Sequence, residues 1–286
     1  MNAAIRIAVV LMMTVIGLGL TVEEFRRLLD RPRLSLLGTI GQWLLLPLAA
    51  AAVAWALPLP PHLVAGMILV VGSPAGAISN YYSYLGGADV ALSVSLTAAV
   101  SVGSVLTMPI IVGLGFKWLL GAGTGQVAPY GAMLFQLLLV VVAPVAVGMV
   151  LRFRFPGWAG RHQRDFRRVS QLILALVVAL VVFSLRQYLL ADLWLTVLST
   201  VLFSILAGVS GLAVGKVAGA DRRQLLTLVI EFACRNTAIT ILIGVAVLDR
   251  PDFAVFGLVF FLTQIPLMLG TVAVAGRWLG ESPDQA

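Results

Sequence analysis

The length of the apolar segments constrains this chain more than any other feature. Many of them approach the ~20 apolar residues that a helix needs to cross the hydrocarbon core of a bilayer. Of the 286 residues, 60% are hydrophobic and 11% are charged, which leaves too few polar side chains to cover a water-soluble core of this size. The sequence therefore predicts an all-α, polytopic membrane protein.

The apolar segments follow one another with short connections. No linker longer than ~15 residues separates them, so the whole chain, 1–286, is predicted to be a single membrane domain. The first segment runs directly into Glu23 and Glu24 without a small-residue cleavage pattern, and we interpret it as a spanning helix rather than a signal peptide. The nine predicted transmembrane helices are 3–22, 34–57, 62–86, 89–115, 129–152, 169–190, 193–217, 223–248 and 252–277.

The basic residues predict the orientation. With nine spans, fourteen of the 19 Lys and Arg residues fall on one side of the membrane. Because cytoplasmic loops carry the excess of basic residues, the C-terminus is predicted to be cytoplasmic and the N-terminus outside, in the cell inner membrane. The fourteen residues are Arg26, Arg27, Arg31, Arg33, Arg152, Arg154, Arg161, Arg164, Arg167, Arg168, Lys216, Arg222, Arg223 and Arg277.

Several classes of function are excluded or disfavoured. The basic clusters lie between apolar segments, and no soluble basic domain exists to bind nucleic acid, so the expected partners are membrane lipid and a small ligand. The sequence identifies no protein partner and no organic cofactor. Cys234 is the single cysteine, and His62 and His162 fall in predicted loops, which excludes disulfide and zinc chemistry. An intramembrane enzyme is disfavoured because Glu231 has no second acid for a dyad, no span holds a histidine, and no serine has a predicted base beside it.

Two groups of three spans, 34–115 and 193–277, have the spacing expected of an inverted repeat. An offset of five helices reverses the direction of the second group through the membrane. The middle span of each group is interrupted by small and polar residues, at 72–80 and at 231–237. Corresponding interruptions in inverted halves are typical of the midplane binding site of a secondary transporter.

The first interruption combines a proline with glycines. Ser73-Pro74, flanked by Gly72 and Gly76, favours an unwound stretch whose freed carbonyl groups need a partner. A cation can be that partner. The alternative is a proline kink that packs against a neighbouring helix.

The second interruption holds a carboxylate, Glu231, at a depth where it costs at least about 2.5 kcal/mol unless it is paired, protonated or bound to an ion. Arg235 lies four residues later, so on a regular helix the two side chains would share a face and could form a purely structural ion pair. Asn236 and Thr237 add polar groups and favour a functional role. Cys234 is expected to be a small packing residue rather than a reactive thiol.

Oxygen-bearing side chains in two other spans indicate a hard cation. Ser93 and Thr97 are four residues apart and share a helix face, and Gln42 adds an amide. Hydroxyl, amide and carboxylate oxygens suit hard cations. Alternatively, the Ser and Thr hydroxyls bond to the preceding turn of their own helix.

These motifs resemble those of the bile acid:sodium symporters along nearly the whole chain. The most specific are Gly-Ser-Pro-x-Gly-x-x-Ser-Asn at 72–80 and Glu-x-x-x-x-Asn at 231–236. Further support comes from 13–33, Gly41-Gln42 with Pro47, Tyr84-Leu85 and 91–94. The resemblance implies an inverted-repeat core, approximately 34–115 and 193–277, whose two broken helices cross at the midplane. It also implies a panel domain made of helices approximately 3–22, 129–152 and 169–190.

The resemblance further implies a secondary active transporter that moves organic anions, bile-acid-like or smaller carboxylates, by alternating access with Na⁺ as the coupling ion. The implied first sodium site consists of Ser79, Asn80, Ser93, Thr97 and Glu231. The implied second site would use Gln42, Glu231, the backbone carbonyls of Phe232 and Cys234, and a glutamine where this chain has Arg235.

Arg235 is the clearest departure from the family pattern. A guanidinium cannot ligate sodium, and we expect it to place a fixed charge in the second site, hydrogen-bonded to Glu231 and Gln42. Alternatively, Arg235 binds an anionic substrate directly. A further alternative is a sodium-independent anion transporter, or a transport-fold sensor, in which Glu231 and Arg235 form a fixed ion pair. The predicted substrate residues are Ala77, Ile78, Arg235, Asn236, Thr263 and Gln264.

Overall fold

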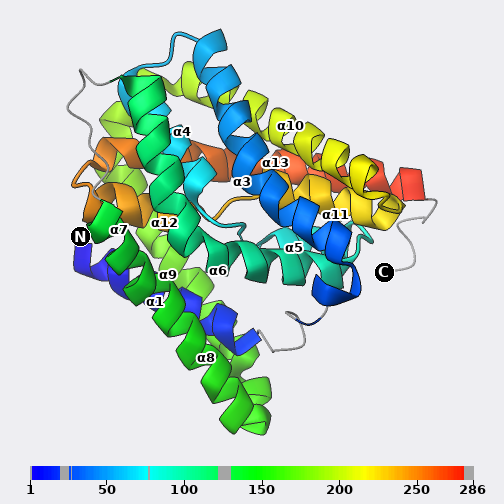
Figure 1. Ribbon diagram of the computed structural model, residues 1–286. Helices are drawn as coiled ribbons and strands as arrows, with labels where there is room; N and C mark the ends of the chain where they lie inside the picture. Colours follow the sequence, from blue (N-terminus) through cyan, green and yellow to red (C-terminus); the bar gives the residue numbers. More distant parts are fainter. Residues whose placement is uncertain (1, 20–25, 27, 77, 122–129, 280–286) are drawn as a thin grey trace.

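The computed structural model describes residues 2–19, 26, 28–76, 78–121 and 130–279, and this part of the chain is helical without a β-strand (Figure 1). The predicted all-α class is confirmed. Five helical segments are long and apolar enough to cross a membrane: Pro32–Ala56, Val90–Leu120, Leu134–Arg154, Leu193–Ala218 and Pro251–Ala275. The chain therefore has the helices of a multi-pass membrane protein.

The α-helices are α1 (Asn2–Gly19), α3 (Pro32–Ala56), α4 (Pro61–Gly72), α5 (Ile78–Leu85), α6 (Val90–Gly115), α7 (Tyr130–Leu137), α8 (Ala143–Arg154), α9 (Pro156–Ala191), α10 (Leu193–Ala218), α11 (Arg222–Ala233), α12 (Thr237–Leu242) and α13 (Ala254–Leu279). Three π-helical segments extend or join them: η1 (Phe116–Leu120), η3 (Leu138–Val142) and η4 (Ile243–Val247). A short 3₁₀-helix, η5 (Pro251–Phe253), precedes α13.

Both predicted interruptions are breaks in the helical backbone. The first separates α4 from α5, and the second separates α11 from α12. Pro74 cannot continue α4 because it has no N–H group. A proline alone does not have this effect, since Pro47, Pro109 and Pro266 all lie inside continuous helices.

The two breaks cross each other. Ala75 and Arg235 form an isolated antiparallel bridge. The N–H of Asn236 donates to the carbonyl of Pro74 at 2.8 Å, and the N–H of Gly76 donates to that of Cys234 at 3.4 Å. A Cβ atom on Gly76 would lie 3.0 Å from the carbonyl oxygen of Arg235, so the close approach favours glycine. The crossing thus satisfies backbone groups that the hydrocarbon core could not satisfy.

The remaining helices pack in two neighbourhoods. Around the crossing, α10 contacts α3, α11 and α13, and α4 contacts α6 and α13. On the other side, α1 packs against α8 and α9 (Figure 1). At the crossing of α1 and α8, a Cβ atom on Gly148 would lie 2.2 Å from the carbonyl oxygen of Thr14, so the two backbones are nearly in contact.

The prediction of a loop between the fifth and sixth spans is wrong. Residues 153–168 were expected to be a basic loop, but α8 continues to Arg154 and α9 begins at Pro156. Arginine is a good helix former and proline is favoured at the first helical position, so low hydropathy alone did not indicate a loop here. His62 and His162 likewise lie in helices, α4 and α9, and not in loops.

Candidate ion and anion site

Glu231 lies in the last turn of α11, and its side chain is completely buried. Its Oε1 atom accepts hydrogen bonds from Ser79 Oγ of α5 at 2.5 Å and from Ser93 Oγ of α6 at 2.6 Å. Thr97 Oγ1, one turn further along α6, lies 3.1 Å from Oε1 and 3.0 Å from Oε2. Hydroxyl groups from two other helices therefore surround the one carboxylate.

Asn80 completes the predicted first sodium site. Its Oδ1 atom lies 2.8 Å from Ser93 Oγ and 3.5 Å from Thr97 Oγ1. All five residues predicted for this site, which we call the Glu231 cluster, are thus brought together: Ser79, Asn80, Ser93, Thr97 and Glu231.

Sequence reasoning missed one neighbour of the cluster, Ser83. Its hydroxyl is buried and donates to Ser93 Oγ at 3.1 Å. The signal was available, because Ser79 and Ser83 are four residues apart and share a face of α5.

The hydroxyl groups of the cluster lie close to more acceptor oxygens than they have protons to donate. Ser93 Oγ lies within hydrogen-bond distance of two acceptors, Glu231 Oε1 and Asn80 Oδ1, yet a hydroxyl carries a single proton. Thr97 Oγ1 similarly lies close to both carboxylate oxygens and to Asn80. A set of hydroxyl, amide and carboxylate oxygens fits a hard cation. Within the described residues no group of three His, Cys, Asp or Glu side chains could hold a metal ion.

The Arg235 guanidinium donates hydrogen bonds to three oxygen atoms. The side chain is 3% exposed, and its Nη1 donates to Gln42 Oε1 of α3 at 2.8 Å. Its Nη2 donates to the carbonyl of Val71 at 3.1 Å and to that of Ser73. On a continuous α4, residues four further along would donate to these carbonyls, and the break removes those bonds. The guanidinium therefore replaces them.

Arg235 does not pair with Glu231, contrary to the predicted contact. Among the described residues no ion pair within 4.0 Å joins the two side chains, although the predicted bond to Gln42 is present. The helical spacing that predicted a shared face does not apply because α11 ends at Ala233. Phe232 and Cys234 are buried, and neither carbonyl accepts from the guanidinium.

Of the predicted substrate residues, Gln264 is the one with a side chain that accepts a hydrogen bond from Arg235 in the described structure. Its Oε1 atom accepts from the backbone N–H of Arg235 at 3.4 Å. Its Nε2 atom and the Nε atom of Arg235 are both buried, and neither has a hydrogen-bond partner in the described structure. Two neighbouring residues thus each keep one unused donor.

The other predicted substrate residues are dispersed. Asn236 caps α12 by accepting from the N–H of Ile239 at 3.4 Å, and half-buried Ile78 begins α5. Thr263 instead points to α10, where its hydroxyl donates to Thr200 Oγ1 at 3.1 Å. Ala77 lies outside the described residues.

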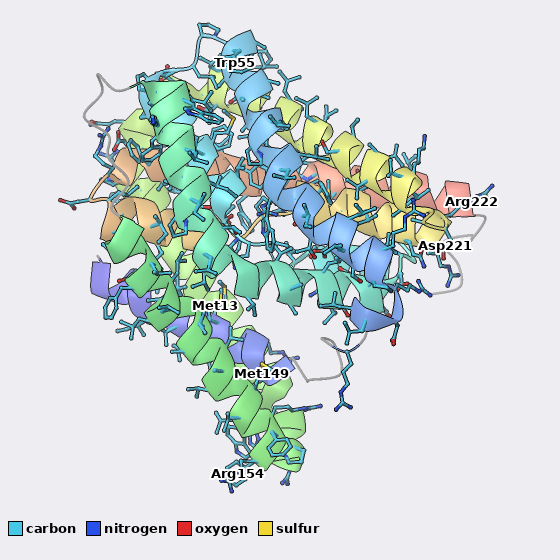
Figure 2. The ribbon with its side chains drawn as sticks, in the orientation of Figure 1. Met13, Trp55, Met149, Arg154, Asp221 and Arg222 are labelled. Atoms are coloured by element: carbon cyan, nitrogen blue, oxygen red, sulfur yellow. The ribbon has the colours of Figure 1, made fainter. Side chains whose placement is uncertain are left out.

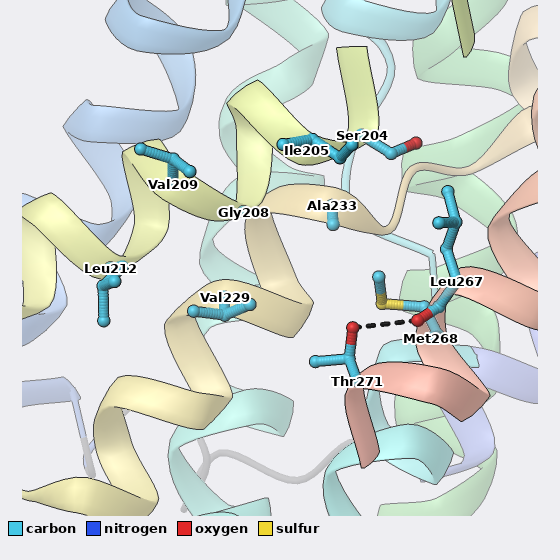
Figure 3. Close-up of a pocket in the computed structure, with 10 residues that line it drawn as sticks. All are labelled: Ser204, Ile205, Gly208, Val209, Leu212, Val229, Ala233, Leu267, Met268 and Thr271. Carbon is cyan, nitrogen blue, oxygen red and sulfur yellow. Dashed lines mark hydrogen bonds between the residues drawn. The ribbon is translucent and has the colours of Figure 1, made fainter. Parts of the chain in front are cut away.

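A separate cavity of about 240 Å³ lies between α10, α11 and α13 (Figure 3). Its lining is mainly apolar and includes Val229, Ala233 and Met268. Two polar side chains reach it, but Ser204 donates to the carbonyl of Thr200 and Thr271 to that of Leu267, both at 2.8 Å. Both hydroxyl donors that reach the cavity are thus used within their own helices.

Comparison with known proteins gives a consistent family. The model of the Sodium Bile acid symporter family matches residues 6–193. The chain is 30% identical over 293 residues to the probable chloroplastic sodium/metabolite cotransporter BASS1 of Arabidopsis thaliana, covering 96% of this chain and 67% of that protein. It is 27% identical over 269 residues to the corresponding BASS2 of Oryza sativa subsp. japonica, covering 93% of this chain and 62% of the relative.

A bacterial relative is the uncharacterized sodium-dependent transporter YocS of Bacillus subtilis (strain 168), which is 26% identical over 226 residues. That match covers 78% of this chain and 68% of the relative. The chain thus spans between 62% and 68% of the length of these three proteins. The family model alone covers well over half of the chain, and the chain therefore belongs to the sodium bile acid symporter family.

Proposed function

We propose that this protein is a secondary active transporter that couples the movement of an organic anion to sodium. The observation that carries the proposal is the convergence of three hydroxyl groups from α5 and α6 on the buried carboxylate of Glu231 in α11, with Asn80 Oδ1 beside them, next to two crossing helix breaks. Family membership supports the same function, since its relatives are named as sodium-dependent transporters.

Sodium is the ion that the Glu231 cluster fits best. Its ligands would all be oxygen atoms, and the formal charge of Glu231 would balance the ion. The surplus of oxygen contacts over hydroxyl protons favours a cation that accepts lone pairs instead of donating hydrogen bonds.

Arg235 replaces a second sodium ion in this proposal. Its guanidinium already occupies the carbonyl groups that the first break frees, together with the amide oxygen of Gln42. A fixed positive charge at this point leaves coupling to one sodium ion per cycle.

The substrate is proposed to be a carboxylate or a similar organic anion near Arg235 and Gln264. The unused donors of these two residues, Nε and Nε2, support this choice because buried donors normally have an acceptor. The Nη atoms of Arg235 donate to Gln42 Oε1 and to the carbonyls of the first break, while its Nε has no partner in the described structure. The same side chain can therefore supply the fixed positive charge and also donate to the anion.

We further propose the nine-span, inverted-repeat architecture for the whole chain, with its N-terminus outside and its C-terminus in the cytoplasm of a cell inner membrane. The core would comprise residues 34–115 and 193–277, and the panel would comprise the helices at 3–22, 129–152 and 169–190, to which α1, α8 and α9 belong. The packing of these three helices on one another supports the division. Rocking of the core against the panel would give alternating access.

The experiment that tests the function is uptake into proteoliposomes. A panel of radiolabelled organic anions, bile-acid-like and smaller carboxylates, is offered with an inward sodium gradient or with an equal potassium gradient. Uptake should require sodium for at least one anion. Equal uptake with potassium would instead support the sodium-independent alternative, and binding without uptake would support the sensor.

The role of Arg235 is tested by Arg235→Gln. This variant removes the guanidinium from the carbonyls of Val71 and Ser73, so that a second sodium ion can bind there. The sodium dependence of uptake should become steeper, and two sodium ions should move with each anion. Sodium and anion fluxes are measured together. Arg235→Lys is the matched control, because it keeps the charge and should keep single-ion coupling. An unchanged stoichiometry with a weakened affinity for the anion would assign Arg235 to the substrate alone.

A further inference from the structure

The tip of the α8–α9 hairpin projects away from the remaining helices (Figures 1 and 2). We call residues 152–162 the hairpin tip. Only Phe155 separates the end of α8 from the start of α9, so the turn is tight and both helices are regular up to it. Figure 2 shows Arg154 at the extreme end of the molecule.

The hairpin tip combines arginines with exposed aromatic rings. Phe153 is 84% exposed, Phe155 58% and Trp158 37%. Large exposed rings are unfavourable in water, and tryptophan in particular is enriched where a membrane meets water. Arg154 and Arg161 are exposed beside them.

Three arginines of this region, Arg152, Arg154 and Arg161, have no carboxylate within 4.0 Å among the described side chains. Residues 152–168 contain six arginines and one acidic residue, Asp165. The ion pairs Arg31–Asp89, His62–Asp192 and Arg250–Asp252 lie elsewhere in the described structure, and Arg152, Arg154 and Arg161 belong to none of them. A partner with negative charge is therefore complementary to the hairpin tip.

From this arrangement we infer that the hairpin tip is a binding site for the headgroup of an anionic phospholipid. Guanidinium groups bind phosphate with paired hydrogen bonds, and Phe153, Phe155 and Trp158 would lie at headgroup level beside it. Juxtamembrane clusters of arginine attract anionic lipids strongly enough to hold them at one place on the surface. The inference does not depend on the proposed transport function.

The test measures which lipids stay bound to the purified protein in native mass spectrometry. Phosphatidylglycerol and phosphatidylcholine with the same acyl chains are added in equal amounts. The wild type should retain phosphatidylglycerol in preference, and Arg154→Gln/Arg161→Gln should lose about tenfold or more of that preference. Arg154→Lys/Arg161→Lys should keep most of it because the charge is conserved.

The matched control removes two cations elsewhere. Lys117 and Arg186 are exposed and lie outside the hairpin tip, and Lys117→Gln/Arg186→Gln should leave the preference unchanged. Equal retention of both lipids by the wild type, or an equal loss in the control variant, would overturn the inference. A preference of the wild type that persists in 0.5 M potassium chloride would also contradict a headgroup bound mainly through charge.

Discussion

At the scale of single residues, the site depends on how two opposite charges are kept apart. Glu231 is surrounded by hydroxyl groups from α5 and α6, whereas Arg235, four residues later, is held by Gln42 and by backbone carbonyls of the first break. Each charge thus has its own hydrogen-bond partners, and no ion pair within 4.0 Å joins the two described side chains. Glu231 consequently keeps its capacity to balance an ion.

Thr97→Val tests whether the Glu231 cluster binds sodium. The substitution removes the hydroxyl that contacts both carboxylate oxygens and keeps the shape of the side chain. The lost contact to a charged group corresponds to about 1.5–3 kcal/mol, so sodium affinity should fall by roughly tenfold or more. Sodium-dependent thermal stabilisation in detergent, compared with potassium, measures the change.

The matched control is Thr107→Val on the same helix. Its hydroxyl donates to the carbonyl of Gly103 and lies outside the cluster. Sodium should stabilise this variant as it stabilises the wild type. If Thr97→Val kept the full sodium effect, the ion would have to bind elsewhere.

At the scale of helices, the breaks were predictable and their partners were not. Pro74 with glycines on either side indicates an unwound stretch, while Pro47 and Pro109 do not interrupt their helices. That the freed carbonyls of Val71 and Ser73 meet a guanidinium depends on a crossing between segments more than 160 residues apart. No local pattern contains that information.

The residues of the candidate site likewise divide into those that the sequence could predict and those that it could not. Ser79, Ser93 and Thr97 could be predicted because hydroxyls at helical spacing share a face. The expected pairing of Glu231 with Arg235 was wrong because it assumed a helix that ends before Arg235. The helical state of residues 156–168 was missed because hydropathy identifies membrane spans and not helices as such.

The contact between α1 and α8 gives a prediction at this scale. Gly148→Leu introduces a side chain where a Cβ atom would already lie 2.2 Å from the carbonyl oxygen of Thr14. The two helices must separate, which should destabilise the protein by at least about 1–3 kcal/mol. Thermal unfolding in detergent measures this. Gly270→Leu on α13 is the control, because nothing lies within 4 Å of its Cβ position; equal losses would mean that the crossing is not close.

At the scale of the whole molecule, the proposed orientation can be tested with single cysteines. Cys234 is completely buried, so Cys234→Ala provides a background without an accessible thiol. Trp55 and Arg154 lie at opposite ends of the molecule (Figure 2), and the proposed topology places Arg222 on the same side of the membrane as Arg154. In intact cells an impermeant maleimide should label Trp55→Cys, but should label Arg154→Cys and Arg222→Cys only after the membrane is opened. The reverse pattern would invert the topology.

The guanidinium held by the first break also determines how the membrane potential acts on the proposed cycle. With Glu231 ionised, one sodium ion, a monovalent anion, Glu231 and Arg235 sum to zero charge, and the empty carrier is neutral as well. A charge that crosses a potential of 100 mV gains or loses about 2.3 kcal/mol, and here no net charge would cross in either direction. Uptake should therefore be the same under potassium diffusion potentials of either sign. In Arg235→Gln the empty carrier would be negative, and transport should become voltage-dependent.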